Sequence, residues 1–356
     1  MSCAISAYRR LCHERGSFGT EPASLRSAFQ PIFTLGVAGQ DPEMSSVKTG
    51  QGGYSYDELK RIWIAAEELG YDSAWLYDHF QPLGRKEAPC LESWTTLAAL
   101  GSVTKKLKIG TMVTSVSYRH PSLLAKMATT VDIISGGRLI LGIGAGWYEE
   151  EYHAYGYEFP DQRTRVRQLK EALIIIEKLW TEDRATFRGQ FYRIQDAISM
   201  PKPKQHPRPR ILVGITKGRK TPPYLAVRYA DGFNTPTGSL EECRAILQSI
   251  GHFCQRCGKD LRDLTKSWQS YVLIGKTSSE VEEIVAKEAK ERGQSPAEFR
   301  KNAVERGFVI GRPDECVQQL GRFKEAGINH FLVIFADDSS IQPLEIFRDE
   351  VIPQRR

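Results

Sequence analysis

The sequence lacks several features that would assign it quickly to a common class. It has no apolar run of the ~18 residues that a membrane-spanning helix needs, and its longest apolar stretch, residues 173–180, contains Glu177 and Lys178. Its seven cysteines are too dispersed for a disulfide framework, which favours a reducing, cytoplasmic compartment. GxSxG, HExxH and P-loop motifs are absent, which removes the common hydrolases, zinc proteases and NTPases. We therefore expect a globular protein with no membrane partner.

Charge is also unremarkable. The chain has 49 basic and 43 acidic residues, a net charge of +6, and its basic residues cluster only at 201–210 and 216–220. No basic face with interleaved aromatics appears, so we expect no nucleic acid partner and favour a small anionic molecule. The CQRC stretch at 254–257 has the spacing of thiolate ligands but no second pair, so we expect no metal.

From residue 55 onward, short apolar runs alternate with amphipathic helical patterns. Ser55 and Glu58 form a capping box at the start of the first helix, and a long helix is expected from about Gln162 to Trp180. The expected strands are residues 73–77, 107–114, 138–144, 210–214, 232–234, 270–275 and 330–335. Continuous apolar strands that alternate with helices predict a parallel sheet covered on both faces.

This pattern favours an α/β fold of the (β/α)8 TIM-barrel type, with an open doubly wound sheet as the alternative. The first strand is either residues 31–39 or the region of 47–49, and loop length favours the second. The barrel domain would then span 44–356, after an N-terminal extension (1–43) that we expect to be poorly ordered. A transit peptide or an upstream start codon would also explain this extension. The charged helical segment 278–304 is expected to form a rim insertion.

Two titratable residues follow the second strand directly. Asp78 and His79 come after the apolar run of residues 74–77, at the end of a barrel strand, where this fold places its chemistry. Histidine can donate or accept a proton near neutral pH, and the neighbouring carboxylate can fix its tautomer or accept a hydrogen bond from a cofactor. The simpler alternative is a capping aspartate beside a surface histidine.

Two further stretches lie at strand ends. LGIGAGW, residues 141–147, carries three alternate glycines but ends in Trp147, so it fails as a dinucleotide fingerprint. Backbone without side chains would let a flat ring lie against it, and tight sheet packing is the alternative. In YRHP, residues 118–121, Arg119 and His120 would hold an anion or pair with Glu92, and the salt bridge is the favoured interpretation.

Taken together and in order, several stretches resemble the luciferase-like monooxygenase superfamily, in particular its branch of deazaflavin (coenzyme F420) dependent oxidoreductases. The resemblance covers about residue 47 to the C-terminus. The stretches are DHFQP, LESWTTLAALGSVT, IGTMVTSVSYRHPSLLAKMATTVDIISGGRLILGIGAGWYEEEYHAYGYEFP, LAVRYADGFN and GINHFLVIF.

The resemblance implies a TIM barrel that holds a deazaflavin or flavin at the C-terminal ends of its strands. His79 corresponds to a catalytic histidine, and Met112 and Val113 to a cis non-proline peptide that supports the ring. The positions implied to contact the cofactor are Asp78, Met112, Val113, Ser115, Ala145, Gly146, Glu150, Gly214, Ile215 and Thr216.

The chain departs from the family pattern at two places. Trp147 stands where the sugar-phosphate dehydrogenases of this branch have a glutamate, so their substrate is not carried over. The loop after the fifth strand, GITKGRKTPP, keeps only Gly214 and Gly218 of the usual glycines that surround the cofactor phosphate. Lys217, Arg219 and Lys220 would supply charge in place of backbone amides; the alternative is a reduced affinity for the cofactor.

The expected function is hydride transfer between coenzyme F420 and a small organic substrate. His79 would be the general acid or base, and Asp78 would anchor the cofactor and the histidine tautomer. Trp94, Tyr118 and Trp147 would line an apolar or aromatic substrate pocket. A monooxygenase that uses reduced FMN and a non-catalytic binding barrel are the alternatives, and a homodimer is expected by analogy.

Overall fold

The computed structural model describes residues 44–83, 86–216, 220–236, 238–335 and 340–353. Two predictions lie outside these residues: the poorly ordered extension 1–43 and the alternative first strand at 31–39. Within the described residues, no helix combines the length and the apolar composition that crossing a bilayer requires.

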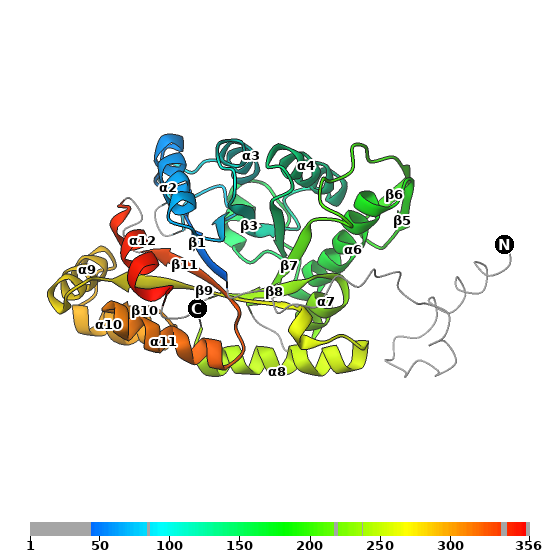
Figure 1. The fold of residues 1–356 in the computed structure, drawn as a ribbon. Helices are drawn as coiled ribbons and strands as arrows, with labels where there is room; N and C mark the ends of the chain where they lie inside the picture. The colour runs from blue at the N-terminus through cyan, green and yellow to red at the C-terminus, as the bar shows by residue number, and fades with distance from the viewer. Residues whose placement is uncertain (1–43, 84–85, 217–219, 237, 336–339, 354–356) are drawn as a thin grey trace. The chain divides into compact units, whose positions relative to one another are not determined.

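Eight parallel strands of the described chain form a closed barrel (Figure 1). Pairing of β11 with β1 and of β8 with β9 closes the ring. This confirms the (β/α)8 barrel that the sequence predicts and places Val47 in a strand. In order around the ring, the strands are β1 (Met44–Lys48), β2 (Ser73–Leu76), β3 (Lys108–Ser115), β4 (Leu139–Gly144), β7 (Arg210–Gly214), β8 (Gly232–Thr235), β9 (Thr265–Ile274) and β11 (His330–Phe335).

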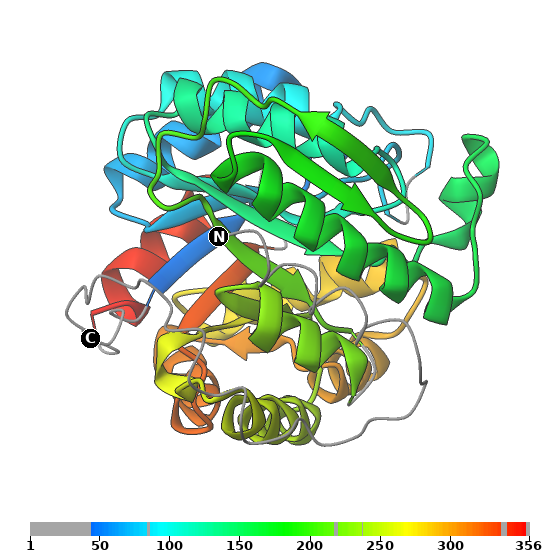
Figure 2. The ribbon, with the colours of Figure 1, turned by 90° about the vertical axis from the view of Figure 1, so that its right-hand side faces the viewer.

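Helices cover the outside of this barrel (Figures 1 and 2). As predicted, Ser55 and Glu58 form a capping box at the start of the first of them. The covering helices are α2 (Tyr56–Glu68), α3 (Ser93–Val103), α4 (Pro121–Ile134), α6 (Gln162–Thr181), α7 (Thr221–Tyr229), α8 (Leu240–Cys257) and α11 (Pro313–Glu325). Shorter ones are α5 (Glu149–Ala154), α12 (Gln342–Ile346) and a π-helical turn (Phe347–Val351).

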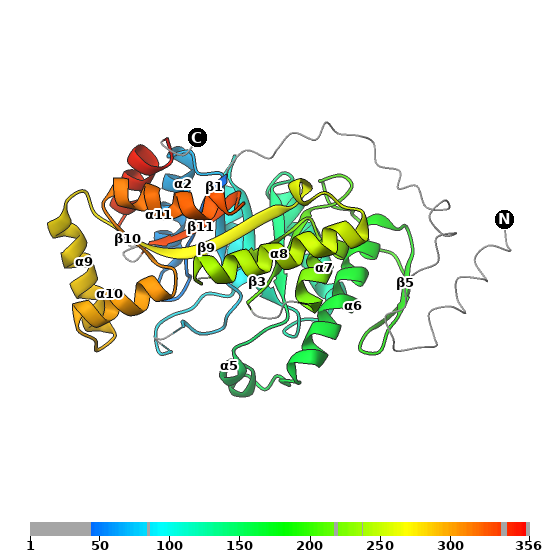
Figure 3. The same cartoon turned by 90° about the horizontal axis from the view of Figure 1, so that it is seen from below.

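Two additions decorate the barrel on opposite sides (Figures 1 and 3). The predicted insertion forms helices α9 (Ser278–Glu291) and α10 (Pro296–Glu305), and the chain then adds an unexpected strand, β10 (Val309–Gly311), beside β9. An antiparallel hairpin of β5 (Ala185–Arg188) and β6 (Arg193–Ala197) was also not anticipated. Its turn packs on α6, where Glu171 accepts hydrogen bonds from three backbone amides of residues 190–192.

The barrel interior is polar toward its N-terminal end and apolar above. His330 Nε2 lies 2.8 Å from Ser46 Oγ, and burial lowers the pKa of His330 to about 3, so its ring is neutral. Inward-facing polar residues also explain why β9 begins at Thr265, five residues before the predicted start: Ser267 accepts a hydrogen bond from the Asn234 side chain on the adjacent strand β8. The apolar layer, which we call the barrel floor, consists of Trp75, Met112, Ile140, Leu212 and Leu332, with Val113 packed against it.

Strand β3 is irregular where it meets the floor. Its register with β4 shifts between Thr111 and Thr114, and the peptide bond between Met112 and Val113 is cis, as the resemblance implies. Gly142 on β4 faces this irregularity, and a Cβ at this position would lie 2.1 Å from the carbonyl oxygen of Thr111. The glycine is therefore required by a close approach of two backbones.

Gly142→Ala is expected to destabilise the protein by about 1–3 kcal/mol, because a strand backbone cannot move away from the added methyl group cheaply. Urea denaturation measures the change. Gly321→Ala is the matched control: this glycine lies inside α11 with nothing within 4 Å of the added Cβ. Helix propensity predicts a gain of about 1 kcal/mol for the control. Equal effects of the two substitutions would contradict the packing argument.

Candidate active site

The end of β2 is held in place by the segment that follows β1. The side-chain amide of Gln51 bonds the backbone of Tyr77 on both sides, accepting from its N–H at 3.2 Å and donating to its carbonyl oxygen. The ring of Tyr77 fills the space that side chains at Gly50 and Gly52 would occupy. The chain therefore leaves the strand in a fixed direction, and Asp78 and His79 follow at the C-terminal mouth of the barrel.

A buried carboxylate from α5 fixes the next residues. Glu151 accepts hydrogen bonds from Nδ1 of His79 at 2.8 Å and from the hydroxyl of Tyr118 at 2.5 Å. Its other oxygen accepts from the backbone amides of Phe80 at 2.6 Å and Gln81 at 3.1 Å. We call this arrangement the Glu151 clamp. It holds the histidine ring and the chain beyond it with one fully buried side chain.

The clamp determines which ring nitrogen of His79 carries a proton. Burial alone would raise the pKa of Glu151, but the hydrogen bonds from His79, Tyr118 and Phe80 outweigh it and lower the pKa below its ordinary value. An ionised carboxylate can only accept hydrogen bonds, so Nδ1 of His79 carries a proton. Nε2 has no hydrogen-bond partner among the described residues, and the side chain keeps 12% exposure. This nitrogen is the one available to a ligand.

Asp78 does not contact the imidazole of His79 as a tautomer anchor would. Its carboxylate forms two hydrogen bonds with Arg119, at 2.6 and 2.9 Å, and accepts a third from the backbone of Ser115 at 3.2 Å. Burial raises the pKa of Asp78, and Arg119 opposes that shift. Arg119 also contacts Glu92 at 2.8 Å, which confirms the salt bridge. The tautomer anchor is therefore Glu151 and not Asp78, because the Asp78 oxygens face the guanidinium.

Aromatic side chains surround the imidazole. The ring centroids of Tyr77, Trp147 and Tyr148 lie 5.3, 5.8 and 5.9 Å from that of His79. Trp147 is 55% exposed and stacks on Tyr148. Its indole is accessible, and its place in a substrate pocket stays a prediction.

The other two expected pocket residues are buried in the protein. Trp94 belongs to the hydrophobic core at 1% exposure, and its indole N–H donates to Thr114 at 3.1 Å. Tyr118 is 6% exposed and lies behind the imidazole, bonded to Glu151. The prediction that Trp94 and Tyr118 line a substrate pocket is therefore wrong. Both side chains are buried and support the site from behind.

Glycines at the ends of β4 and β7 make room for the irregular part of β3. A Cβ at Gly144 or Gly214 would lie 2.8 or 3.1 Å from the side chain of Val113. A Cβ at Gly146 would collide with the hydroxyl of Tyr152 and lie 2.8 Å from Oγ of Ser115. Protein atoms, and not open space, occupy these positions. Tight packing, the alternative interpretation of LGIGAGW, therefore explains why these positions are glycine. That a flat ring lies against this backbone stays a prediction.

The remaining expected cofactor positions differ in accessibility. Val113, Ala145, Gly146 and Gly214 are partly exposed, whereas the side chain of Ile215 is buried and Thr216 is exposed. Ser115 is 7% exposed, with its hydroxyl bonded to Tyr152. Lys217 and Arg219, expected to supply charge to a phosphate, lie outside the described residues.

The resemblance implied Glu150 as a cofactor contact, and the sequence analysis missed its neighbour Glu151. Glu150 is exposed and pairs with Lys86, whereas Glu151 is buried. A signal was present in the spacing: Glu151 is three residues from Tyr148 and four from Tyr155, on the helix face that carries aromatics.

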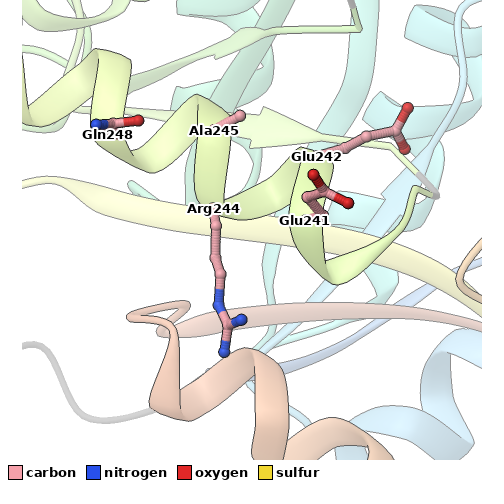
Figure 4. A pocket seen from close by; sticks show the side chains of 5 residues that line it. All are labelled: Glu241, Glu242, Arg244, Ala245 and Gln248. Atoms are coloured by element: carbon pink, nitrogen blue, oxygen red, sulfur yellow. The ribbon is translucent and has the colours of Figure 1, made fainter.

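A separate hollow lies on the exposed face of α8 (Figure 4). It is lined by Glu241, Glu242, Arg244, Ala245 and Gln248. All five come from a single helix and none is bonded to a residue of the Glu151 clamp. It is therefore not part of the candidate active site.

Glu151→Gln is expected to lower the free energy of unfolding by about 1–3 kcal/mol, because the amide leaves buried donors poorly paired. Urea denaturation at neutral pH measures this, and Glu150→Gln, on the exposed neighbour, is the matched control and is expected to leave the midpoint unchanged. An equal midpoint for both variants would contradict the clamp.

The stability difference should also depend on pH. Because the folded-state pKa of Glu151 is lowered, its contribution is fully present above the unfolded-state pKa of about 4.3. The contribution is lost as the pH falls through the folded-state pKa. The difference in unfolding free energy between wild type and Glu151→Gln should therefore shrink below about pH 4. A difference that grows on acidification would be inconsistent with a lowered pKa.

Comparisons with known proteins agree with this architecture. The family model for luciferase-like monooxygenases matches residues 33–330. An F420-dependent glucose-6-phosphate dehydrogenase of Intrasporangium calvum is 30% identical over 322 residues, which cover 84% of this chain and 95% of that protein.

Solved structures share the fold at lower identity. An F420-dependent secondary alcohol dehydrogenase in complex with an F420-acetone adduct has a TM-score of 0.76 at 24% identity, over 88% of this chain and 99% of that chain. The oxygenating constituent of 3,6-diketocamphane monooxygenase from Pseudomonas putida, in complex with FMN, has a TM-score of 0.72 at 20% identity, over 88% and 99%. The chain belongs to the luciferase-like monooxygenase family and is an oxidoreductase.

Proposed function

We propose that the protein transfers a hydride between coenzyme F420 and a small apolar or aromatic organic substrate. The observation that carries this proposal is the state of His79. Nδ1 of His79 is hydrogen-bonded to Glu151, and Nε2 has no hydrogen-bond partner among the described residues. An oriented imidazole with one free nitrogen at the mouth of a barrel is suited to proton transfer beside a reacting centre.

The strand ends around His79 fit a flat cofactor ring. The barrel floor is apolar, and Val113, Ala145 and Gly146 are partly exposed at the ends of β3 and β4. Such a ring would rest on the Met112–Val113 segment, with the backbone of residues 144–146 beside it. When bound, a deazaflavin accepts or donates a hydride and reacts poorly with oxygen. The protein would supply binding, orientation and proton transfer.

The comparisons favour F420 over FMN. The curated relative at 30% identity is named for F420, whereas the FMN complex, at 20% identity, supports only the likeness of fold. Oxygen insertion with reduced FMN therefore remains the alternative that an experiment must exclude.

Trp147 supports an apolar or aromatic substrate. The resemblance implies that the sugar-phosphate dehydrogenases have an acid at this position. Here an exposed indole stacks on Tyr148, with its ring centroid 5.8 Å from that of His79. A broad apolar surface beside the proton-transfer group favours substrates whose apolar groups are buried against it on binding.

The chain's own residues would perform the proton step. In the oxidising direction, Nε2 of His79 would accept the proton of a substrate hydroxyl while the carbon of that alcohol loses its hydride to the cofactor. Glu151 would stabilise the resulting imidazolium through Nδ1. The tautomer of the imidazole, with its proton on Nδ1 and Nε2 free, is set before the substrate binds. No rearrangement of the ring is therefore needed.

Titration with cofactors tests the proposal. The protein is expected to bind coenzyme F420, seen as a change in the cofactor's absorbance or fluorescence, and to show no oxygen uptake with reduced F420. Binding of FMN but not F420, together with oxygen uptake, would contradict the proposal and favour the monooxygenase.

His79→Asn is expected to lower kcat by about 10²–10⁴-fold, because the variant retains a polar side chain but loses the acid–base group. Its affinity for cofactor should match that of the wild type. His153→Asn is the matched control, because His153 is exposed on α5, the helix that supplies Glu151. An unchanged kcat in His79→Asn would remove this residue from the proton step. The assay screens reduction of F420 against a panel of alcohols and oxidation of reduced F420 against carbonyl and unsaturated acceptors.

A further inference from the structure

A lysine is buried inside the barrel at its mouth. Lys48 is the last residue of β1, at the C-terminal end of that strand, and is 8% exposed. Its Nζ donates a hydrogen bond to Oε1 of Gln269 on β9 at 3.1 Å. Because β11 lies between β1 and β9 in the sheet, this bond crosses the inner face of β11, and both side chains point into the barrel.

The register places this pair beside the barrel floor. Lys48 is opposite Trp75 on β2, and Gln269 is opposite Leu332 on β11. Trp75 and Leu332 belong to the floor together with Met112. Side chains that are opposite in parallel strands point to the same face. The ammonium group therefore shares the interior with the segment that would support the cofactor ring.

This ammonium group has little to balance it. No described carboxylate lies within salt-bridge distance of Lys48, and the two buried acids of the mouth are engaged elsewhere, Asp78 with Arg119 and Glu151 with His79. An ammonium group has three N–H donors, and among the described residues Lys48 donates to Gln269 alone. Burial lowers the pKa of Lys48 to about 8, so the side chain is still largely protonated at neutral pH. A buried unpaired cation is costly unless a ligand supplies the compensating charge.

We propose that Lys48 binds the anionic form that the cofactor ring acquires on reduction, and so favours the reduced state. The proposal rests on the proposed function. Arrival of a hydride brings two electrons and one proton as a single unit, so a neutral ring gains one negative charge, spread over its pyrimidine nitrogen and carbonyl oxygen. The Lys48 ammonium would offset that charge without any proton transfer, while the proton of the substrate hydroxyl goes to His79. A positive charge near this end of a flavin-type ring is a known means of tuning its electronics.

Lys48→Met tests this, because methionine has a similar length and no charge. The dissociation constants of oxidised and reduced F420 are measured by titration for the wild type and the variant. We expect the variant to weaken binding of the reduced form at least tenfold more than that of the oxidised form. A tenfold change corresponds to a midpoint potential of bound cofactor lower by about 30 mV. If only FMN binds, the same comparison is made with oxidised and reduced FMN.

Lys108→Met is the matched control, because Lys108 is an exposed lysine at the start of β3, the opposite end of the barrel. It should leave the ratio of the two dissociation constants unchanged. An equal ratio in Lys48→Met and the wild type would overturn the inference and leave the proposed function intact. Failure of the wild type to bind either cofactor would overturn both.

The stability of the ligand-free protein distinguishes a binding role from a structural one. If Lys48 awaits a ligand anion, Lys48→Met keeps or raises the Tm of the ligand-free protein, because an unpaired buried charge is removed. If Lys48 instead neutralises an acid of this chain, the variant lowers the Tm and leaves the ratio of dissociation constants unchanged. The second result would contradict the inference.

Discussion

The buried carboxylate of Glu151 is the contact on which the candidate active site depends. It bonds His79, Tyr118 and the backbone amides of Phe80 and Gln81, so α5, the end of β2 and the loop after β3 meet at one side chain. An unpaired carboxylate could not be buried there, and the four donors remove that cost. The same contacts leave one imidazole nitrogen for the ligand. Position and protonation of the proposed acid–base group therefore have a single origin.

Most of the fold follows from local patterns in the sequence, and the exceptions have a common cause. Apolar strands, the Ser55 capping box and the long helix from Gln162 predicted the barrel and most of its elements correctly. The first half of β9 was missed because its inward residues are polar and bond partners on other strands, as Gln269 bonds Lys48. Hydrophobic periodicity cannot identify a strand whose inner face is satisfied by hydrogen bonds from distant residues.

The site was only partly predictable for a similar reason. The resemblance correctly indicated the cis peptide at Met112–Val113, and the strand pattern correctly placed His79 just beyond the end of β2. It did not indicate that Glu151 would hold that histidine, because the burial of one acid in a run of three depends on how α5 packs. Trp94 was assigned to the pocket for its residue type, yet its hydrogen bond to Thr114 is satisfied inside the core. Residue type identifies candidates, and tertiary packing decides which of them face a ligand.

The proposed role of His79 in proton transfer requires that its neutral ring carries the proton on Nδ1. Nitrogen NMR of the protein labelled at histidine nitrogens measures it directly, with the His79 signals assigned by their loss in His79→Asn. The account predicts that neutral His79 carries its proton on Nδ1 in the wild type, and that Glu151→Gln abolishes this preference. A neutral ring protonated on Nε2 in the wild-type protein would contradict it, because the free nitrogen would then be unable to accept a proton from substrate.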